Sequence, residues 1–251
     1  MLEIRPRRTT TNPRGPAMQK RTKIITASIV AGVLVLGATA AIAGPIVYRD
    51  FIVGPAADAP TVTVTPNPSA GAGEAEASDL TGAWTVAGGS FAGYRVDEVL
   101  NGTDVTVVGR TEQVTGTLAV ADTTLESAEI TVDVASIATD SSNRDDYFRQ
   151  NAVRVDENPT ATFVLTDAVV SDGAPAVGEV QTIQATGDLT LAGVTRSVTV
   201  ELEAVLNGET GQVAGSIPIT FADFGVEAPN LGFVSVEPDG YVEFSLELAR
   251  A

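Results

Sequence analysis

The sequence predicts an antiparallel all-β domain, a sandwich or a barrel, with one short helix and an apolar segment before it. Residues 187–206 are the clearest evidence, because GDLTLAGVTRSVTVELEAVL contains two strand-like stretches joined by a tight turn at Ala192-Gly193. In the second stretch apolar and polar residues alternate, which is typical of an antiparallel strand with one dry and one wet face. Similar stretches recur between turn signals along the chain, and this repetition predicts a sandwich or a barrel.

The N-terminal segment is predicted to cross a membrane. No residue from 24 to 47 is charged, and the run is mostly apolar and long enough for a spanning helix. Residues 1–23 form a basic tail, which predicts a cytoplasmic N-terminus and an extracytoplasmic domain. The alternative is a secreted protein, cleaved after Ala41-Ile42-Ala43. Both interpretations place the rest of the chain outside the cytoplasm.

The chain after this segment divides into a linker and a single domain. Residues 48–79 are rich in Pro, Ala, Gly, Thr and Ser and have little apolar bulk, so they are predicted to form a flexible linker. Residues 80–250 have the length of one domain, which opens at Trp84.

Within the domain, apolar and polar residues alternate in a series of predicted strands. Besides 187–206 they cover residues 114–120, 129–134, 162–166, 217–219 and 241–248. Four dipeptides are turn signals: Asn101-Gly102, Asp172-Gly173, Asn207-Gly208 and Asp239-Gly240. One segment breaks the pattern, because capping residues at 141–143 and acids at 145–146 predict a short helix near 142–150. Asn158-Pro159 then returns the chain to an extended course.

Composition excludes several classes of function. The 251 residues include no Cys and no His, so Ser-His-Asp and Cys-His sites and most zinc sites are absent. No nucleophile with an adjacent base, no paired carboxylates at a recognisable spacing and no phosphate loop occur, so the chain is not expected to be an enzyme or to hold a cofactor. Composition leaves open a Mg²⁺ or Ca²⁺ site made of carboxylates alone, but there is no EF-hand loop, and no metal site is predicted. Beyond residue 23 there are eight basic and 31 acidic residues, a net charge of −23 that disfavours nucleic acid as a partner.

Three separated segments, taken in order, resemble the YceI-like family over about residues 84–248. The first is Ser136-Ile137 and Thr139, then Arg144-Asp145, Asn158-Pro159 and Thr162-Phe163, which is similar to the family's S-I-x-T … R-D … P-x-x-T-F stretch. The second is Gly187-Asp188-Leu189-Thr190 with Gly193-Val194-Thr195-Arg196. The third is Asp223-Phe224-Gly225-Val226 before a final strand at 241–248.

This resemblance implies an elongated lipocalin-like antiparallel barrel of about eight strands, whose apolar interior holds a long-chain amphiphile. In the family such a ligand is typically a polyisoprenoid, for example a quinone with an isoprene tail. A barrel of this size can be filled by its own side chains or can hold one ligand. The sequence departs from the family at Tyr147, where many members have His, so a headgroup contact through His is not expected here. The Tyr147 hydroxyl could donate a hydrogen bond instead.

Eight apolar residues are candidate ligand contacts because they are predicted to point into the barrel. They are Phe163, Leu165, Leu189, Val198, Val200, Leu202, Phe244 and Leu246. Periodicity does not distinguish a filled core from the wall of a lipid tunnel; the resemblance favours a cavity.

Three candidates lie on the predicted helix. Arg144 either forms a local salt bridge or meets a polar headgroup at the barrel mouth. Tyr147 and Phe148 either flank that mouth or plug the core. Two further features are expected to be structural: Arg196 pairs with a nearby acid, and a turn at 223–225 seats Phe224 in the barrel end.

The sequence thus favours an extracytoplasmic protein of a bacterial envelope that binds, sequesters or transports a long-chain isoprenoid or acyl lipid. The N-terminal helix is its membrane contact, a homodimer is a possible assembly, and no cofactor is expected apart from a bound isoprenoid lipid or quinone. The alternative is an envelope interaction module whose barrel is filled and has no lipid ligand.

Overall fold

The computed structural model describes residues 56–64, 80–171, 173 and 175–251. The predicted membrane segment 24–47 and the basic tail lie outside these residues. Within the described part of the chain, no helix is long and apolar enough to cross a membrane. The strands are β1 (Gly82–Val86), β2 (Phe91–Leu100), β3 (Thr103–Thr111), β4 (Val114–Ala121), β5 (Thr124–Asp133), β6 (Thr160–Leu165), β7 (Val169–Val170), β8 (Val180–Leu191), β9 (Val194–Asn207), β10 (Thr210–Thr220) and β11 (Val234–Arg250). The helical turns are η2 (Val134–Ser136), α2 (Ser142–Tyr147), η3 (Phe148–Ala152) and η4 (Phe221–Phe224).

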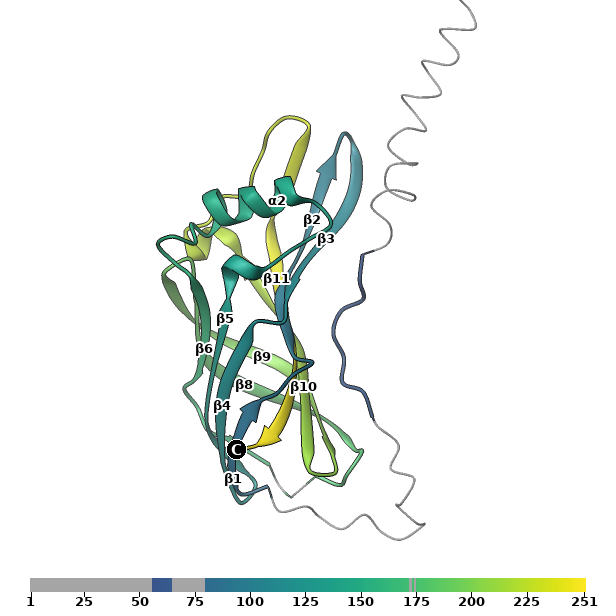
Figure 1. Cartoon of the computed structure of the whole chain (residues 1–251), viewed down its shortest axis with the longest axis vertical. Helices are drawn as coiled ribbons and strands as arrows, with labels where there is room; N and C mark the ends of the chain where they lie inside the picture. The colour runs from purple at the N-terminus through teal and green to yellow at the C-terminus, as the bar shows by residue number, and fades with distance from the viewer. Residues whose placement is uncertain (1–55, 65–79, 172, 174) are drawn as a thin grey trace, which may run out of the picture. The chain divides into compact units, whose positions relative to one another are not determined.

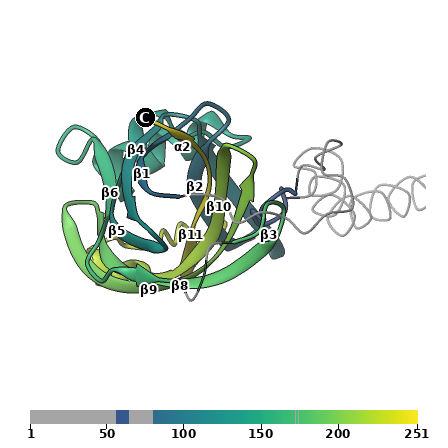
Figure 2. The same ribbon diagram turned by 90° about the horizontal axis from the view of Figure 1, so that it is seen from below.

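These strands form a closed antiparallel barrel, as the sequence predicts. The sheet order is β1-β4-β5-β6-β8-β9-β10-β11-β2-β3, and pairing of β1 with β11 closes the ring. Strands β1 and β2 lie end to end and occupy one position in the ring, and β3 and β4 do the same. The barrel therefore has eight strands around its circumference. Figure 2 shows this ring of strands end-on. Helix α2 lies across one end, and the C-terminus lies at the other (Figure 1).

Two of the predicted turns are of type I′. Asn101-Gly102 joins β2 to β3 with φ angles of 50° and 79°, and Ala192-Gly193 joins β8 to β9 with 47° and 79°. Positive φ at both central residues defines the type I′ turn, whose twist matches that of the flanking strands. Asn207-Gly208 lies between β9 and β10, with φ of 74° at the glycine. These turns therefore fix the register of three hairpins.

The prediction of a turn at Asp239-Gly240 is wrong. Both residues lie inside β11, where the register against β2 shifts between Val236 and Gly240. A Cβ at Gly240 would lie 2.8 Å from the main-chain oxygen of Arg95 and 2.8 Å from the ring of Phe221. The glycine is thus needed for a close approach at a bulge, not for a reversal of the chain.

The predicted short helix is present. Helix α2 spans Ser142–Tyr147 and continues as the π-type turn η3 over Phe148–Ala152. Its first turn is held by the Asp145 carboxylate, which accepts hydrogen bonds from the Thr139 main-chain N–H at 2.9 Å and from the Thr139 hydroxyl at 2.7 Å. The helix therefore crosses the barrel end as a segment tied to the loop before it.

The buried side chains form three clusters along the barrel. One is centred on Trp84, Leu206 and Leu248 near the C-terminal end. A second gathers Leu189, Val200 and Phe224, which confirms that the turn at 223–225 seats Phe224 in the core. A third, smaller cluster of valines lies between the extended ends of β2 and β3. Two cavities accompany the first two clusters and make up the candidate site.

Candidate functional site

The interior of the barrel contains an apolar cavity of about 130 Å³, called here the upper cavity. Inward-facing residues of successive strands line it, as expected where alternate side chains of each strand share a face. The lining comprises Ala92, Leu118, Leu125, Ala128, Ile130, Val132, Ala161, Thr162, Phe163, Leu165, Ile183, Ala185, Leu189, Leu191, Val200, Leu202, Val213, Ile217, Val242, Phe244, Leu246 and Leu248. No charged side chain is among them, so this wall offers contacts to hydrocarbon and no partner for an ion.

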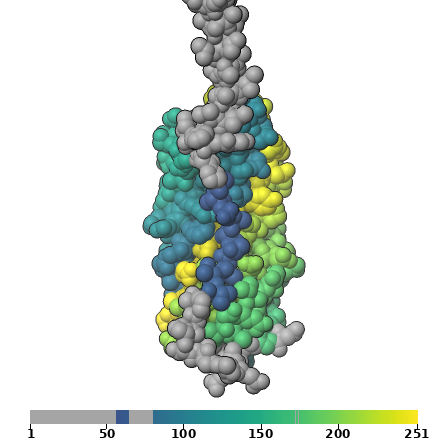
Figure 3. All heavy atoms as spheres, turned by 90° about the vertical axis from the view of Figure 1, so that its right-hand side faces the viewer, coloured from purple at the N-terminus to yellow at the C-terminus, as the bar shows by residue number. Residues whose placement is uncertain are grey.

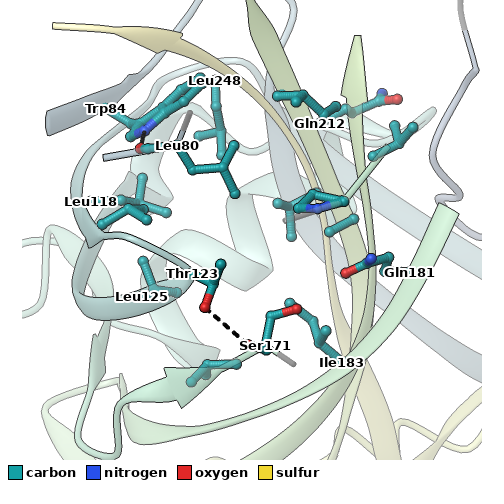
Figure 4. Close-up of a pocket in the computed structure, with 18 residues that line it drawn as sticks. Leu80, Trp84, Leu118, Thr123, Leu125, Ser171, Gln181, Ile183, Gln212 and Leu248 are labelled. Atoms are coloured by element: carbon teal, nitrogen blue, oxygen red, sulfur yellow. Dashed lines mark hydrogen bonds between the residues drawn. The ribbon is translucent and has the colours of Figure 1, made fainter. Parts of the chain in front are cut away.

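A second cavity of about 170 Å³, the lower cavity, lies toward the barrel end that holds the C-terminus. Figure 4 shows Trp84, Leu118 and Leu125 on one side of it and Gln181 and Ile183 on the other. Its lining also includes polar residues, namely Thr123, Ser171, Gln181 and Gln212. The Gln212 amide itself points out of the barrel, where it contacts Thr63 and Ser245. The Thr123 hydroxyl donates a hydrogen bond of 2.9 Å to the main-chain oxygen of Ser171. These uncharged groups give this cavity hydrogen-bonding capacity that the upper one has only at Thr162.

The two cavities are neighbours along the barrel, separated by side chains that belong to both linings. The shared residues are Leu118, Leu125, Ile183, Val213 and Leu248. All are aliphatic and bend at rotatable side-chain bonds, so rotamer changes of these residues would join the two spaces. The two cavities are therefore adjacent, with these five side chains between them.

Small residues on the inner wall create the upper cavity. Ala92, Ala128, Ala161 and Ala185 stand where larger aliphatic side chains would fill the space. Two glycines make room for rings: a Cβ at Gly215 would lie 2.9 Å from Cζ of Phe244, and a Cβ at Gly187 would collide with the ring of Phe163. The rings thus lie close against bare backbone, which leaves space in the middle of the barrel.

Most of the predicted wall residues line the upper cavity. Seven of the eight are in its lining: Phe163, Leu165, Leu189, Val200, Leu202, Phe244 and Leu246. Val198 instead packs against the buried cluster that contains Phe224. Their position on the wall is confirmed; their contact with a ligand stays a prediction.

The three predicted helix residues line neither cavity. The Arg144 guanidinium donates to Glu98 at 3.0 Å and to Asp140 at 2.5 Å, which is the local salt bridge that the sequence allowed. The Phe148 ring stacks on Tyr94 with ring centroids 5.0 Å apart. Tyr147 is half-buried beside them. Their contact with a headgroup stays a prediction.

The Arg144 ion pairs and burial shift the pKa values of two groups under the helix. Burial alone would lower the pKa of the Arg144 guanidinium, but Glu98 and Asp140 outweigh it, and the pKa lies above its ordinary value. Burial raises the pKa of the Tyr94 hydroxyl far above its ordinary value, against the opposing effect of Arg144. Both groups therefore keep their protons throughout the physiological range.

Sequence reasoning missed the lower cavity and the alanines of the upper one. The sequence marks Trp84 only as the opening of the domain and does not distinguish Gln181 or Ile183. Alternation in β8 could have extended the inward face back to these residues, because they precede Ala185 and Leu189 by even numbers of positions.

Among the described residues, no group of His, Cys, Asp or Glu is arranged to hold a metal ion.

The chain is similar in sequence to one family model and to several curated proteins. A family model, the YceI-like domain, matches residues 84–248. The UPF0312 protein of Pseudomonas aeruginosa strain LESB58 is 31% identical over 119 residues, which cover 45% of this chain and 58% of that protein. A UPF0312 protein of Pseudomonas paraeruginosa matches to the same extent. The matched region thus spans little more than half the length of these curated relatives.

Among solved structures, a polyisoprenoid binding domain from Saccharophagus degradans, implicated in plant cell wall breakdown, has a TM-score of 0.56 and 20% identity. The match covers 67% of this chain and 98% of that one. Burkholderia cenocepacia BcnA gives a TM-score of 0.49 at 24% identity, covering 62% of this chain and 96% of the other. At these identities the first likeness shows a common barrel fold.

Proposed function

The chain belongs to the YceI-like domain family, and from this premise we propose that its barrel binds a long apolar chain, such as that of a polyisoprenoid lipid, and carries or sequesters it. The single observation that supports this most is the upper cavity, whose lining has no charged side chain. Burial of hydrocarbon there is favourable by roughly 25 cal/mol per Å² of apolar surface removed from water. The description of the Saccharophagus degradans domain as polyisoprenoid binding agrees with the proposal.

The cavity volumes limit what fits without rearrangement. An apolar cavity of about 150 Å³ holds one benzene molecule, so spaces of about 130 and 170 Å³ each take about one five-carbon isoprene unit. A tail of two units would span both cavities once the shared side chains rotate. Longer tails would need further widening of the barrel, or part of the ligand would have to extend out of the barrel at the lower end. The polar groups of the lower cavity would then contact the head of the ligand.

The proposed setting is the outer face of a bacterial membrane. The uncharged run 24–47 and the basic tail before it support an anchor, with the barrel on the extracytoplasmic side. Release of the domain by cleavage after Ala43 is the other form of the same proposal. In either form the protein binds and transfers its ligand and performs no reaction on it.

Trp84 provides a direct test, because it is the only tryptophan of the chain and lines the lower cavity. We expect a benzoquinone with a two-isoprene tail to quench its fluorescence saturably in the full-length protein. Ala185→Phe, which fills the upper cavity, should weaken binding at least tenfold. Gln184→Phe is the matched control, since this neighbour on β8 is exposed on the opposite face and should leave binding unchanged.

Mass spectrometry of organic extracts from protein purified out of its native envelope would identify the natural ligand. A stoichiometric prenyl or acyl species would support the proposal. A parent protein that shows no saturable quenching, or quenching that Ala185→Phe does not weaken, would exclude a ligand in this interior. The barrel would then act as an interaction module.

A further inference from the structure

Residues 56–64 lie extended along the outside of the barrel, although they belong to the stretch predicted as a linker. Figure 3 shows this segment running over the surface of the barrel as a band of its own colour. It crosses from β3 and β2, where Arg110 and Arg95 meet it, to β9 and β10, where Glu203 and Gln212 meet it. The segment forms no strand, so sheet pairing does not hold it.

Hydrogen bonds to the main chain hold the segment in place. Arg95 donates to the Ala57 oxygen at 2.6 Å, and Arg110 donates to the Asp58 oxygen at 2.7 Å. At the other end, the Val62 N–H donates to Glu203 at 3.2 Å.

Thr63 makes two such contacts. Its N–H donates to the Gln212 side-chain oxygen at 2.5 Å, and its oxygen accepts from the Asn207 amide at 3.1 Å. All five contacts pair a barrel side chain with a peptide group of the segment. These hydrogen bonds therefore hold the extended backbone of the segment.

Several residues on the outer wall beneath the segment are buried although they face away from the barrel interior. Glu243 faces outward from β11, yet it is only 1% exposed. Ser245 and Gln212 also face outward and are buried, as is Ala214. By contrast, outward-facing Glu201 and Thr199 on β9 are exposed, as is usual for a barrel. Burial of polar groups on an outer wall is costly unless they have partners.

Glu243 orients the two arginines that face the segment. Its carboxylate accepts from Arg95 Nε at 2.5 Å and from Arg110 Nη2 at 3.4 Å. Arg110 also lies over the ring of Phe91, 4.5 Å from its centroid. A guanidinium fixed by a carboxylate and a ring presents its remaining N–H groups in one direction with little loss of side-chain entropy. Here that direction is toward the oxygens of Ala57 and Asp58.

From these contacts we propose that residues 56–64 are a latch: the outer wall of the barrel binds the backbone of the chain's own tether and fixes where the tether leaves the domain. The polar residues Arg95, Arg110, Glu203, Asn207 and Gln212 are the receptor. The latch is independent of any lipid in the interior, so its failure and the failure of the proposed function are separate results.

The test measures a distance between two spin labels in the full-length chain. The protein has no cysteine, so Thr61→Cys in the segment and Glu129→Cys on β5 supply the only two thiols, and both positions are exposed. Double electron–electron resonance should give one narrow distance distribution in this parent. A broad distribution in the parent would overturn the proposal.

Proline and alanine variants then separate backbone recognition from side-chain recognition. Val62→Pro with Thr63→Pro removes two N–H donors while favouring the same extended conformation. It should release the latch, giving a broad distribution with a longer mean distance. Val62→Ala with Thr63→Ala keeps both donors and should leave the distribution narrow. A proline variant that stays narrow, or an alanine variant that broadens, would contradict backbone recognition. These variants leave the barrel residues unchanged, so its melting temperature is the folding control.

Discussion

Gly187 and Gly215 show how single residues shape the space inside the barrel. Both are inward-facing strand glycines that lie against aromatic rings, and both leave out a side chain that the rings of Phe163 and Phe244 would otherwise meet. Glycine in a strand normally weakens it, because it has no side chain to pack and gains freedom in the unfolded chain. Here the loss is offset by the ring that packs over the exposed backbone.

Gly187→Ala is therefore expected to lower the free energy of unfolding by about 1–3 kcal/mol, the usual cost of overpacking. The new Cβ would lie 2.6 Å from the main-chain oxygen of Val164, which cannot rotate away. Gly88→Ala is the control, because Gly88 is exposed and a Cβ there meets nothing within 4 Å. Urea unfolding of both variants measures the difference; equal stabilities would show that the wall shifts to admit the methyl group.

Tyr94 is expected to make the protein sensitive to alkali. Its pKa is raised in the folded state by burial, whereas in the unfolded chain it titrates near 10. Above that pH the folded state binds one more proton than the unfolded state, so stability falls as pH rises. Below about pH 10 both states are protonated, and the full contribution of Tyr94 is present.

The check is to compare the melting temperature of the parent and Tyr94→Phe between pH 8 and 11.5. The parent should lose up to about 1.4 kcal/mol of stability per pH unit above pH 10 from this residue, and Tyr94→Phe should lose less. Parallel pH profiles would show that the Tyr94 hydroxyl is solvated in the folded protein.

At the scale of elements, helix α2 is held on the barrel end by one ion pair and one aromatic stack. The Glu98 carboxylate is almost fully buried and reaches Arg144 from β2, while Phe148 stacks on Tyr94 of the same strand. The sequence predicted the helix from its caps and acids, but it could not say which strand the helix contacts. That contact is made with β2, which is not among the strands that alternation predicted.

Arg144→Ala should loosen this end of the barrel. It leaves the Glu98 carboxylate buried without its partner, and we expect a loss of about 2 kcal/mol, less than for a fully buried pair because Arg144 is partly solvated. Arg149→Ala, which breaks the exposed pair with Asp146, should cost less than about 0.5 kcal/mol. Hydrogen exchange of the amides in 142–152 would report the difference. Equal protection in the two variants would mean that the stack alone holds the helix.

For the whole molecule, local pattern predicted a sandwich or a barrel, the family resemblance favoured a barrel with a cavity, and neither located the two cavities. Alternation in 194–206 and the Ala192-Gly193 turn fix which residues face inward, since a strand has a period of two residues. Whether Ala185 leaves a space depends on what packs opposite it, from strands far away in the sequence. The docked segment 56–64 was equally hidden, because it lies in a stretch rich in Pro, Ala and Thr and its hydrogen bonds to the barrel are made by backbone groups.

The latch shortens the maximum distance between the proposed membrane anchor and the barrel. A chain spans at most about 3.6 Å per residue, so the nine residues from Val47 to Ala56 allow at most about 32 Å, and the 33 from Val47 to Leu80 allow at most about 119 Å. With the proposed anchor, a docked tether would keep the barrel within about one bilayer thickness of the surface. A released tether would let it search a distance several times greater. The same short contact would then decide whether a carrier serves its own membrane or delivers its cargo farther away.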